Sequence, residues 1–90
     1  MYSIEVTPAA DRDLDRLKEH MQRRDFERLR IAIRGLAREP RPQGVAKLRG
    51  TEGAYRIRAG PYRVVYDIHD DRALVVILKV ARRSETTYKR

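Results

Sequence analysis

The hydrophobic period of this chain of 90 residues changes near residue 45, and this change constrains the fold more than any other feature. Before that point apolar residues recur at spacings of three and four, as in an amphipathic helix, and after it they alternate as in a strand. Three alternating segments, 54–59, 62–69 and 73–80, are separated by the turn signals Gly60-Pro61 and Asp70-Asp71-Arg72. We therefore expect two helices followed by three consecutive antiparallel strands.

A short strand and a helical hairpin are predicted before the change of period. Residues 2–7 alternate, which indicates a strand. Thr7 suits a helix N-cap and Pro8 the first helical position. A second helix is expected to open at Asp25 and to end in the proline-rich segment 38–44. The positions expected to face the core are Tyr2, Ile4 and Val6 in the strand, Ala10, Leu14, Leu17 and Met21 in the first helix, and Phe26, Leu29, Ile33 and Leu36 in the second.

These elements predict the fold class α+β, in the order β-α-α-β-β-β. The helical hairpin is expected to pack on one face of a mainly antiparallel four-stranded sheet. A chain of this length builds one core, so residues 1–90 are predicted to form a single domain. Cysteine is absent, and neither a membrane-spanning run nor a signal peptide is found, so we expect a cytoplasmic protein without membrane contact.

The last three strands are expected to divide their side chains between a core face and a solvent face. Gly60-Pro61 suits a two-residue type II′ turn, which places Ile57 opposite Val64 and Arg58 opposite Arg63. The predicted inner set is Tyr55, Ile57, Tyr62, Val64, Tyr66 and Ile68, followed by Leu74, Val76, Leu78 and Val80 on the last strand. Lys79 and Arg83 are expected to point outward.

The charge of the chain points to an anionic ligand. Lys and Arg number 21 against 13 Asp and Glu, giving a net charge of +8. Arg56, Arg58 and Arg63 share the predicted outer face, and Arg82 and Arg83 arrive beside it. Like charges directly opposite each other across a strand pair destabilise a sheet, so an anion is expected there. A solvated face without a ligand is the alternative, because salt screens surface repulsion.

The sequence offers few residues in an arrangement suited to metal or cofactor chemistry. His20 and His69 have no partner at ligand spacing. Asp11, Asp13 and Asp15 alternate on a helix, so they do not form a carboxylate pair. We therefore predict neither a metal site nor a cofactor.

Three segments carry a resemblance to a known family. The runs KLRGTEGAYRIRAGPYRVVYDI (47–68) and LVVILKVARRSETTY (74–88) resemble the RelE toxins of the RelE/ParE superfamily, and IEVTPAADRDLDRL (4–17) is similar to their first strand and helix. The resemblance implies the RelE-like microbial RNase fold. It also implies the toxin of a type II toxin–antitoxin system, a metal-independent endoribonuclease that cleaves mRNA in the A site of the small ribosomal subunit and so inhibits translation. The implied partners are the ribosome, mRNA and a RelB-like antitoxin in a hetero-oligomer.

The family's functional residues fall on five positions, which the resemblance implies to be catalytic: Arg56, Arg58, Arg63, Arg83 and Tyr88. We predict that Lys47, Arg49, Lys79 and Arg82 bind RNA or the ribosome. Arginine keeps a pKa above about 12 and cannot serve as a general base, so Tyr88 is the leading titratable candidate, as a base or as a stacking platform. The chain departs from the best-known pattern in having arginines where some members have lysines, and in being one residue shorter before the tyrosine.

Two other functions remain open. The ParE branch has the same fold and is associated with poisoning DNA gyrase by binding it, without nuclease activity. The tail RRSETTY and the Arg56, Arg58 and Arg63 cluster favour the ribonuclease branch. A basic RNA-binding module without chemistry would need only the cations and would tolerate loss of Tyr88.

Overall fold

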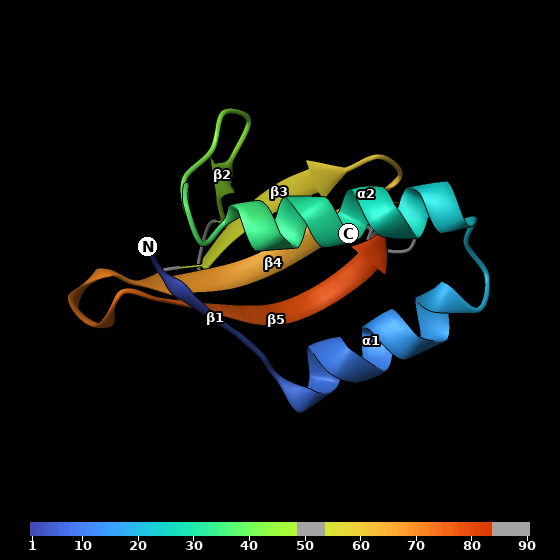
Figure 1. The fold of residues 1–90 in the computed structure, drawn as a ribbon, viewed down its shortest axis with the longest axis horizontal. Helices are drawn as coiled ribbons and strands as arrows, with labels where there is room; N and C mark the ends of the chain where they lie inside the picture. Colours follow the sequence, from blue (N-terminus) through green and yellow to red (C-terminus); the bar gives the residue numbers. More distant parts are fainter. Residues whose placement is uncertain (49–53, 84–90) are drawn as a thin grey trace.

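Two helices cover one face of a five-stranded sheet in the part of the chain that the computed structural model describes, residues 1–48 and 54–83 (Figure 1). The strand order is β1-β5-β4-β3-β2, and β1 pairs with β5 in parallel while the other pairs are antiparallel. The α+β class and the order of the predicted elements are confirmed, whereas the predicted number of four strands is wrong by one. The elements are β1 (Ser3–Val6), α1 (Pro8–Lys18), α2 (Arg23–Gly35), β2 (Ala46–Lys47), β3 (Ala54–Ala59), β4 (Tyr62–His69), the 3-10 turn η1 (Asp70–Arg72) and β5 (Leu74–Arg82).

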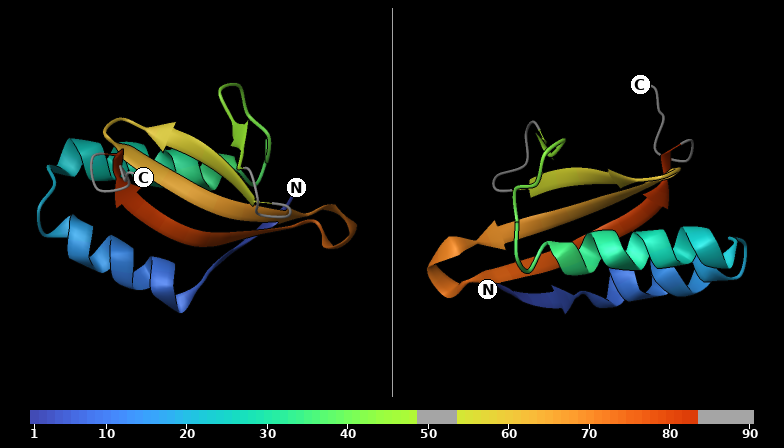
Figure 2. Two further views of the ribbon diagram at one scale, coloured as in Figure 1. Left: turned by 180° about the vertical axis from the view of Figure 1, so that it is seen from behind. Right: turned by 45° about the horizontal axis from the view of Figure 1, so that its top comes forward.

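The helix starts follow local chemistry. Thr7 caps α1, its Oγ1 accepting a hydrogen bond from the Ala10 N–H at 3.2 Å, and Pro8 is the first helical residue as predicted. Helix α2 begins at Arg23, two residues before the predicted Asp25, after the N-cap Gln22. Both helices lie against the same face of the sheet (Figure 2), which leaves the opposite face uncovered by helices.

The core lies between the helices and the sheet. Leu29 of α2 and Leu36 at its C-cap are fully buried in one cluster with Val64 and Tyr66 of β4. The predicted inner set of β3 and β4 is confirmed, with Tyr55 and Ile68 partly buried at its border. Val6 is an exception in β1, because 42% of it is exposed. The other members of the core are Ala10, Leu17, Ile33, Ile57, Ala59, Tyr62, Val75, Ile77 and Val80.

The β3–β4 hairpin has the predicted register. Ile57 pairs with Val64, Arg58 with Arg63 and Arg56 with Val65. Gly60 has a φ of 62°, the positive value that the first position of a type II′ turn requires and that glycine adopts without strain. The turn chemistry therefore fixes which side chains share the outer face.

The turn before β5 overturns the predicted faces of the first part of that strand: His69 pairs with Leu74, so the turn holds the four residues 70–73 instead of the predicted three, Asp70 to Arg72. A β-bulge follows further along β5. Val65 pairs with Lys79 and Tyr66 with Ile77, so Leu78 is an extra residue on β5. Before the bulge Val75 and Ile77 lie in the main core cluster, whereas the predicted Val76 and Leu78 are only partly buried and the predicted Leu74 is buried but lies outside that cluster. After the bulge Val80 faces the core as predicted, because the extra residue Leu78 offsets the extra residue in the turn.

A polar cluster ties the loop after α2 to the far end of the sheet. Arg41 donates two hydrogen bonds to Asp70, at 3.2 and 2.8 Å, and its guanidinium lies over the Tyr55 ring. Tyr2 donates a third hydrogen bond to Asp70. Arg41 and Tyr2 hold the pKa of Asp70 at about 2, below its ordinary 3.8. Below them, the buried Tyr66 donates to the Pro40 carbonyl at 2.7 Å, and burial raises the pKa of its phenol to about 12.

Candidate nucleic-acid interface

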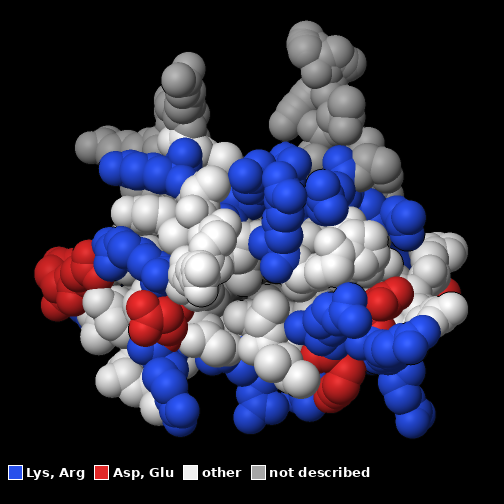
Figure 3. All heavy atoms as spheres, turned by 90° about the horizontal axis from the view of Figure 1, so that it is seen from above, with Lys and Arg blue, Asp and Glu red and all other residues white. Residues whose placement is uncertain are grey.

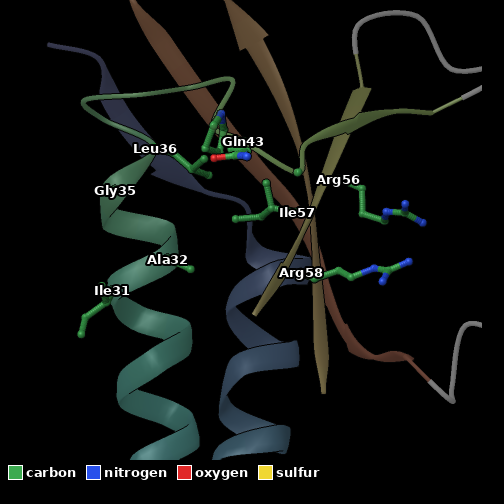
Figure 4. A pocket seen from close by; sticks show the side chains of 10 residues that line it. Ile31, Ala32, Gly35, Leu36, Gln43, Arg56, Ile57 and Arg58 are labelled. Carbon is green, nitrogen blue, oxygen red and sulfur yellow. The ribbon is translucent and has the colours of Figure 1, made fainter. Parts of the chain in front are cut away.

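Arginines gather on the face of the sheet that the helices leave uncovered. Arg56 and Arg58 lie two residues apart on β3, and Arg63 lies directly opposite Arg58 on β4. Figure 4 shows Arg56 and Arg58 pointing away from α2, while Ile57 between them points toward it. We refer to Arg56, Arg58, Arg63 and Lys79 as the arginine face.

Lys79 joins this face through the register of β5. It pairs with Val65, which lies between Arg56 and Arg63 on the same side of the sheet, and it is exposed. Val65 therefore supplies an apolar position among the cations. Figure 3, which looks down on the β2–β3 edge, shows Lys and Arg side chains gathered above a band of uncharged atoms.

Arg63 carries an unusual donor. Its Nε is buried and finds no hydrogen-bond acceptor within the described residues. A buried donor without an acceptor costs roughly 1–3 kcal/mol, so such a group in a native protein calls for an explanation. An anionic oxygen bound on this face would supply the acceptor.

Arg83 is held next to the arginine face by its backbone. Its N–H donates to the Pro61 carbonyl in the β3–β4 turn at 2.9 Å, which fixes the end of β5 beside the turn that joins Arg58 to Arg63. The side chain of Arg83 is exposed, and the residue comes directly after the end of β5 at Arg82. The predicted approach of this arginine to the cluster is therefore confirmed.

The other predicted positions have different placements. Arg82 pairs with Tyr62, and its guanidinium lies over the Tyr62 ring at 5.8 Å, so it belongs to the helix side of the sheet and not to the arginine face. Lys47 is exposed on β2 and pairs with Tyr55, so the register places it on the helix side of the sheet, like Tyr55, and not on the arginine face. Arg49 and Tyr88 lie outside the described residues.

Sequence reasoning missed the Arg41 and Asp70 cluster, since it read Asp70 as turn chemistry and the segment around Arg41 as an ordinary loop. Arg41 and Asp70 are 29 residues apart, and Tyr2 and Asp70 are 68 residues apart, so no local sequence pattern indicates these hydrogen bonds. Within residues 1–48 and 54–83, no group of three or more His, Cys, Asp or Glu is arranged to hold a metal ion. The same residues contain no helix long and apolar enough to cross a membrane.

Several known proteins are similar to this chain in sequence and in fold. Residues 4–87 match the family described as the ParE toxin of a type II toxin–antitoxin system, parDE. This chain belongs to the RelE/ParE toxin family. Toxin RelG of Mycobacterium tuberculosis is 35% identical over 84 residues, which are 93% of each chain. Toxin RelE of the same organism is 36% identical over 83 residues, 92% of this chain and 82% of the relative.

This RelE/ParE toxin is similar in structure to toxins solved in complex with their antitoxins. The toxin–antitoxin complex RelBE2 of M. tuberculosis contains a chain with 34% identity and a TM-score of 0.72, covering 91% of this chain and 98% of that one. The archaeal RelE–RelB complex of Pyrococcus horikoshii matches at 27% identity and a TM-score of 0.76, covering 94% and 98%. The chain is thus a RelE-type toxin of a type II toxin–antitoxin system, and the family match spans the arginine face and Arg83.

Proposed function

We propose that this toxin is a metal-independent endoribonuclease that cuts mRNA in the ribosomal A site and so inhibits translation. The ribose 2′-oxygen attacks the adjacent phosphorus, and the bond from phosphorus to the 5′-oxygen of the next nucleotide breaks. One proton leaves the 2′-hydroxyl and one is delivered to the departing 5′-oxygen. The products are a 2′,3′-cyclic phosphate and a 5′-hydroxyl.

The arginine face and Arg83 are proposed to bind the scissile phosphate and to stabilise the charge that builds on it. The cross-strand pair of Arg58 and Arg63 carries this proposal, because two cations are kept opposite each other at a cost in stability. The buried Nε of Arg63 is a fixed donor already stripped of water, which a phosphate oxygen would satisfy. Donors held in place before the reaction stabilise a transition state without further reorganisation.

Proton transfer is assigned to the tail. Arginine stays protonated, so the arginine face supplies charge and not a base. Tyr88 is the proposed base for the 2′-proton or a platform on which the nucleotide stacks. A phenol accepts a proton only as a phenolate, the form that neighbouring cations favour in general.

Because the proposed site has few groups that can act as acid or base, we expect it to cleave RNA only weakly in the absence of the ribosome. The ribosome is proposed to hold the mRNA in the geometry for in-line attack. Lys47, Arg49, Lys79 and Arg82 are proposed to contact RNA or the ribosome through their charge. A RelB-like antitoxin is proposed to neutralise the toxin in a hetero-oligomer, as the similarity to antitoxin-bound structures supports.

Primer extension on a defined mRNA bound to purified ribosomes tests the proposal. The wild type is expected to cut only when ribosomes are present, and Arg83→Ala to lose about a hundredfold in rate, the usual loss for one group that stabilises a transition state. Tyr88→Phe should also slow the cleavage. Arg72→Ala is the matched control, because Arg72 is an exposed arginine in η1 at the opposite end of β5.

Two results would contradict the proposal. Efficient cleavage without ribosomes would show that the site needs no help with geometry. A toxic wild type that cuts no mRNA but traps DNA gyrase on DNA would place the chain with the gyrase poisons.

A further inference from the structure

The face of the sheet that the helices leave uncovered carries one acidic side chain on β4 (Figure 2). Inner and outer residues alternate along this strand, and its outer residues are Arg63, Val65, Asp67 and His69. Arg56 pairs with Val65, so Asp67 is its diagonal neighbour, at a Cα separation of roughly 7–8 Å. Asp67 therefore lies at the border of the arginine face.

Asp67 has apolar neighbours on both adjoining strands. It pairs with Ala54 of β3 and Val76 of β5, and Val65 precedes it on the same face. Asp67, Val65 and Val76 are each partly buried. In residues 1–48 and 54–83 the Asp67 carboxylate takes part in no ion pair and accepts no side-chain hydrogen bond. No described side chain therefore competes for its two oxygens.

A carboxylate at this position weakens the binding of RNA in general. The net charge of +8 and the arginine face attract phosphates, and a negative charge at the border of that face opposes the attraction. An element that repels most ligands while it admits one of them is a common source of specificity. The position thus favours an RNA that offers hydrogen-bond donors beside its phosphate.

The hydrogen-bonding chemistry of a carboxylate selects one base. An ionised aspartate accepts hydrogen bonds at two oxygens and donates none. Single-stranded RNA is read on the Watson–Crick edges of its unstacked bases, and guanine is the one base of the four with two adjacent donors there, N1–H and the 2-amino group. Adenine, cytosine and uracil each present an acceptor beside their donor. That acceptor would meet the lone pairs of the second carboxylate oxygen.

Val65 separates the phosphate-binding cations from Asp67 along the strand. Arg63 and Asp67 are four residues apart on β4, roughly 13–14 Å, with Val65 midway between them. A nucleotide whose phosphate lies on Arg56 and Arg63 can lay its base across Val65, where contact between apolar surfaces is favourable. The Watson–Crick edge of that base then faces Asp67.

We propose that Asp67 is a specificity-determining residue, which accepts two hydrogen bonds from the guanine of a nucleotide whose phosphate is bound by the arginine face. Val65 and Val76 form the apolar floor under this base. The inference rests on the proposed function in naming mRNA as the source of the nucleotide. Asp67 contacts the base and not the reacting atoms, so it determines which sequences are bound.

NMR titration of the full-length, isotope-labelled toxin with short RNAs tests this assignment. The probe is UUGUU with a 2′-O-methyl group on every ribose, which prevents attack by the 2′-oxygen. Two comparison RNAs carry inosine or adenine in place of guanine, and inosine lacks only the 2-amino group. The wild type is expected to bind the guanine RNA about tenfold more tightly than the adenine RNA, with the inosine RNA between them. The amide signals of residues 65–68 and 76 should shift.

Two variants with the same change of charge separate base recognition from general electrostatics. Asp67→Asn keeps the size of the side chain and replaces one acceptor by a donor. It should bind the guanine and adenine RNAs within about twofold of each other, and the adenine RNA more tightly than the wild type does, because a negative charge near the phosphates is removed. Asp71→Asn is the control, since Asp71 is exposed in η1, and it should keep the guanine preference.

Equal binding of the guanine and inosine RNAs by the wild type would overturn the inference, and this comparison requires no variant to fold. A guanine preference that persists in Asp67→Asn would also overturn it, as would signal shifts that map away from β4 and β5. The RNAs cannot be cleaved and no ribosome is present. A toxin that cuts mRNA but shows no preference in this titration would therefore refute the inference alone, and one that prefers guanine but cuts no mRNA would refute the proposed function alone.

Discussion

Replacing Arg63 by methionine is expected to stabilise the fold while it weakens RNA cleavage. Arg63 lies directly opposite Arg58, and its Nε is buried without an acceptor in the described residues. Methionine keeps an apolar stem for packing and removes both the charge and the buried donor. Directly opposed like charges cost roughly 0.2–1 kcal/mol, and release of the buried donor adds to the gain, so we expect a net stabilisation of about 1 kcal/mol.

Urea unfolding at two salt concentrations measures this effect. With a slope of about 1 kcal/mol per molar for a small domain, the midpoint of Arg63→Met should rise by about 1 M at low salt. The charge contribution should nearly vanish in about 1 M salt, where the screening length is about 3 Å. The contribution of the buried donor should remain, because it does not depend on long-range charge.

A double-mutant cycle with Arg58→Met isolates the repulsion. Each single replacement should stabilise the fold, and the double replacement should gain less than the sum, since either change alone already removes the repulsion. The reasoning is refuted if Arg63→Met unfolds at lower urea concentration than the wild type at low salt. It is also refuted if the gain from Arg63→Met is unchanged in the Arg58→Met background.

The polar cluster at the other end of the sheet gives two further predictions. Tyr66→Phe should lower the free energy of unfolding by about 1 kcal/mol in urea titrations, because the hydrogen bond to the Pro40 carbonyl is lost, and a phenylalanine variant as stable as the wild type would contradict this. The folded state lowers the pKa of Asp70 from 3.8 to about 2, so its stabilising effect over Asp70→Asn should be complete above pH 3.8 and disappear as the pH falls to about 2. Thermal midpoints of both proteins across this range measure it, and a difference that stays constant with pH would refute the assignment.

The β3–β4 hairpin was predictable because its information is local. Gly60-Pro61 specifies the turn, the turn specifies the register, and the register brings Arg56, Arg58 and Arg63 to one face. The start of α1 was predictable for the same reason, since Thr7 and Pro8 act within one helical turn. Most of the arginine face therefore follows from short-range rules.

The faces of β5 and the existence of β2 were not predictable in this way. The turn before β5 holds residues 70–73, one more than the predicted three, so alternation counted forward from the turn assigns the wrong faces until the extra residue of the bulge, Leu78, restores them. Strand β2 has only Ala46 and Lys47, too few residues to show a period. Its pairing with β3 depends on tertiary structure.

Long-range side-chain pairing was also hidden from the sequence. Arg41 meets Asp70 only because the loop after α2 and the turn before β5 reach the same end of the sheet. Arg82 was expected beside the outer face, but its pairing with Tyr62 places it on the helix side of the sheet, while Arg83 follows the end of the strand. The two residues look equivalent in the sequence and differ in the fold.

The bulge at Leu78 also determines where β5 can change length during evolution. Deleting Leu78 would leave Ile77 opposite Tyr66 and Lys79 opposite Val65, so every later residue would keep its face. Deleting Val80 or Ala81 would instead exchange the core and outer positions up to Arg83. Leu78 is thus dispensable for alternation and contributes curvature, since a bulge bends and twists its strand. Related toxins could gain or lose this residue and keep their arginines in place, while the angle at which the chain leaves the sheet changes.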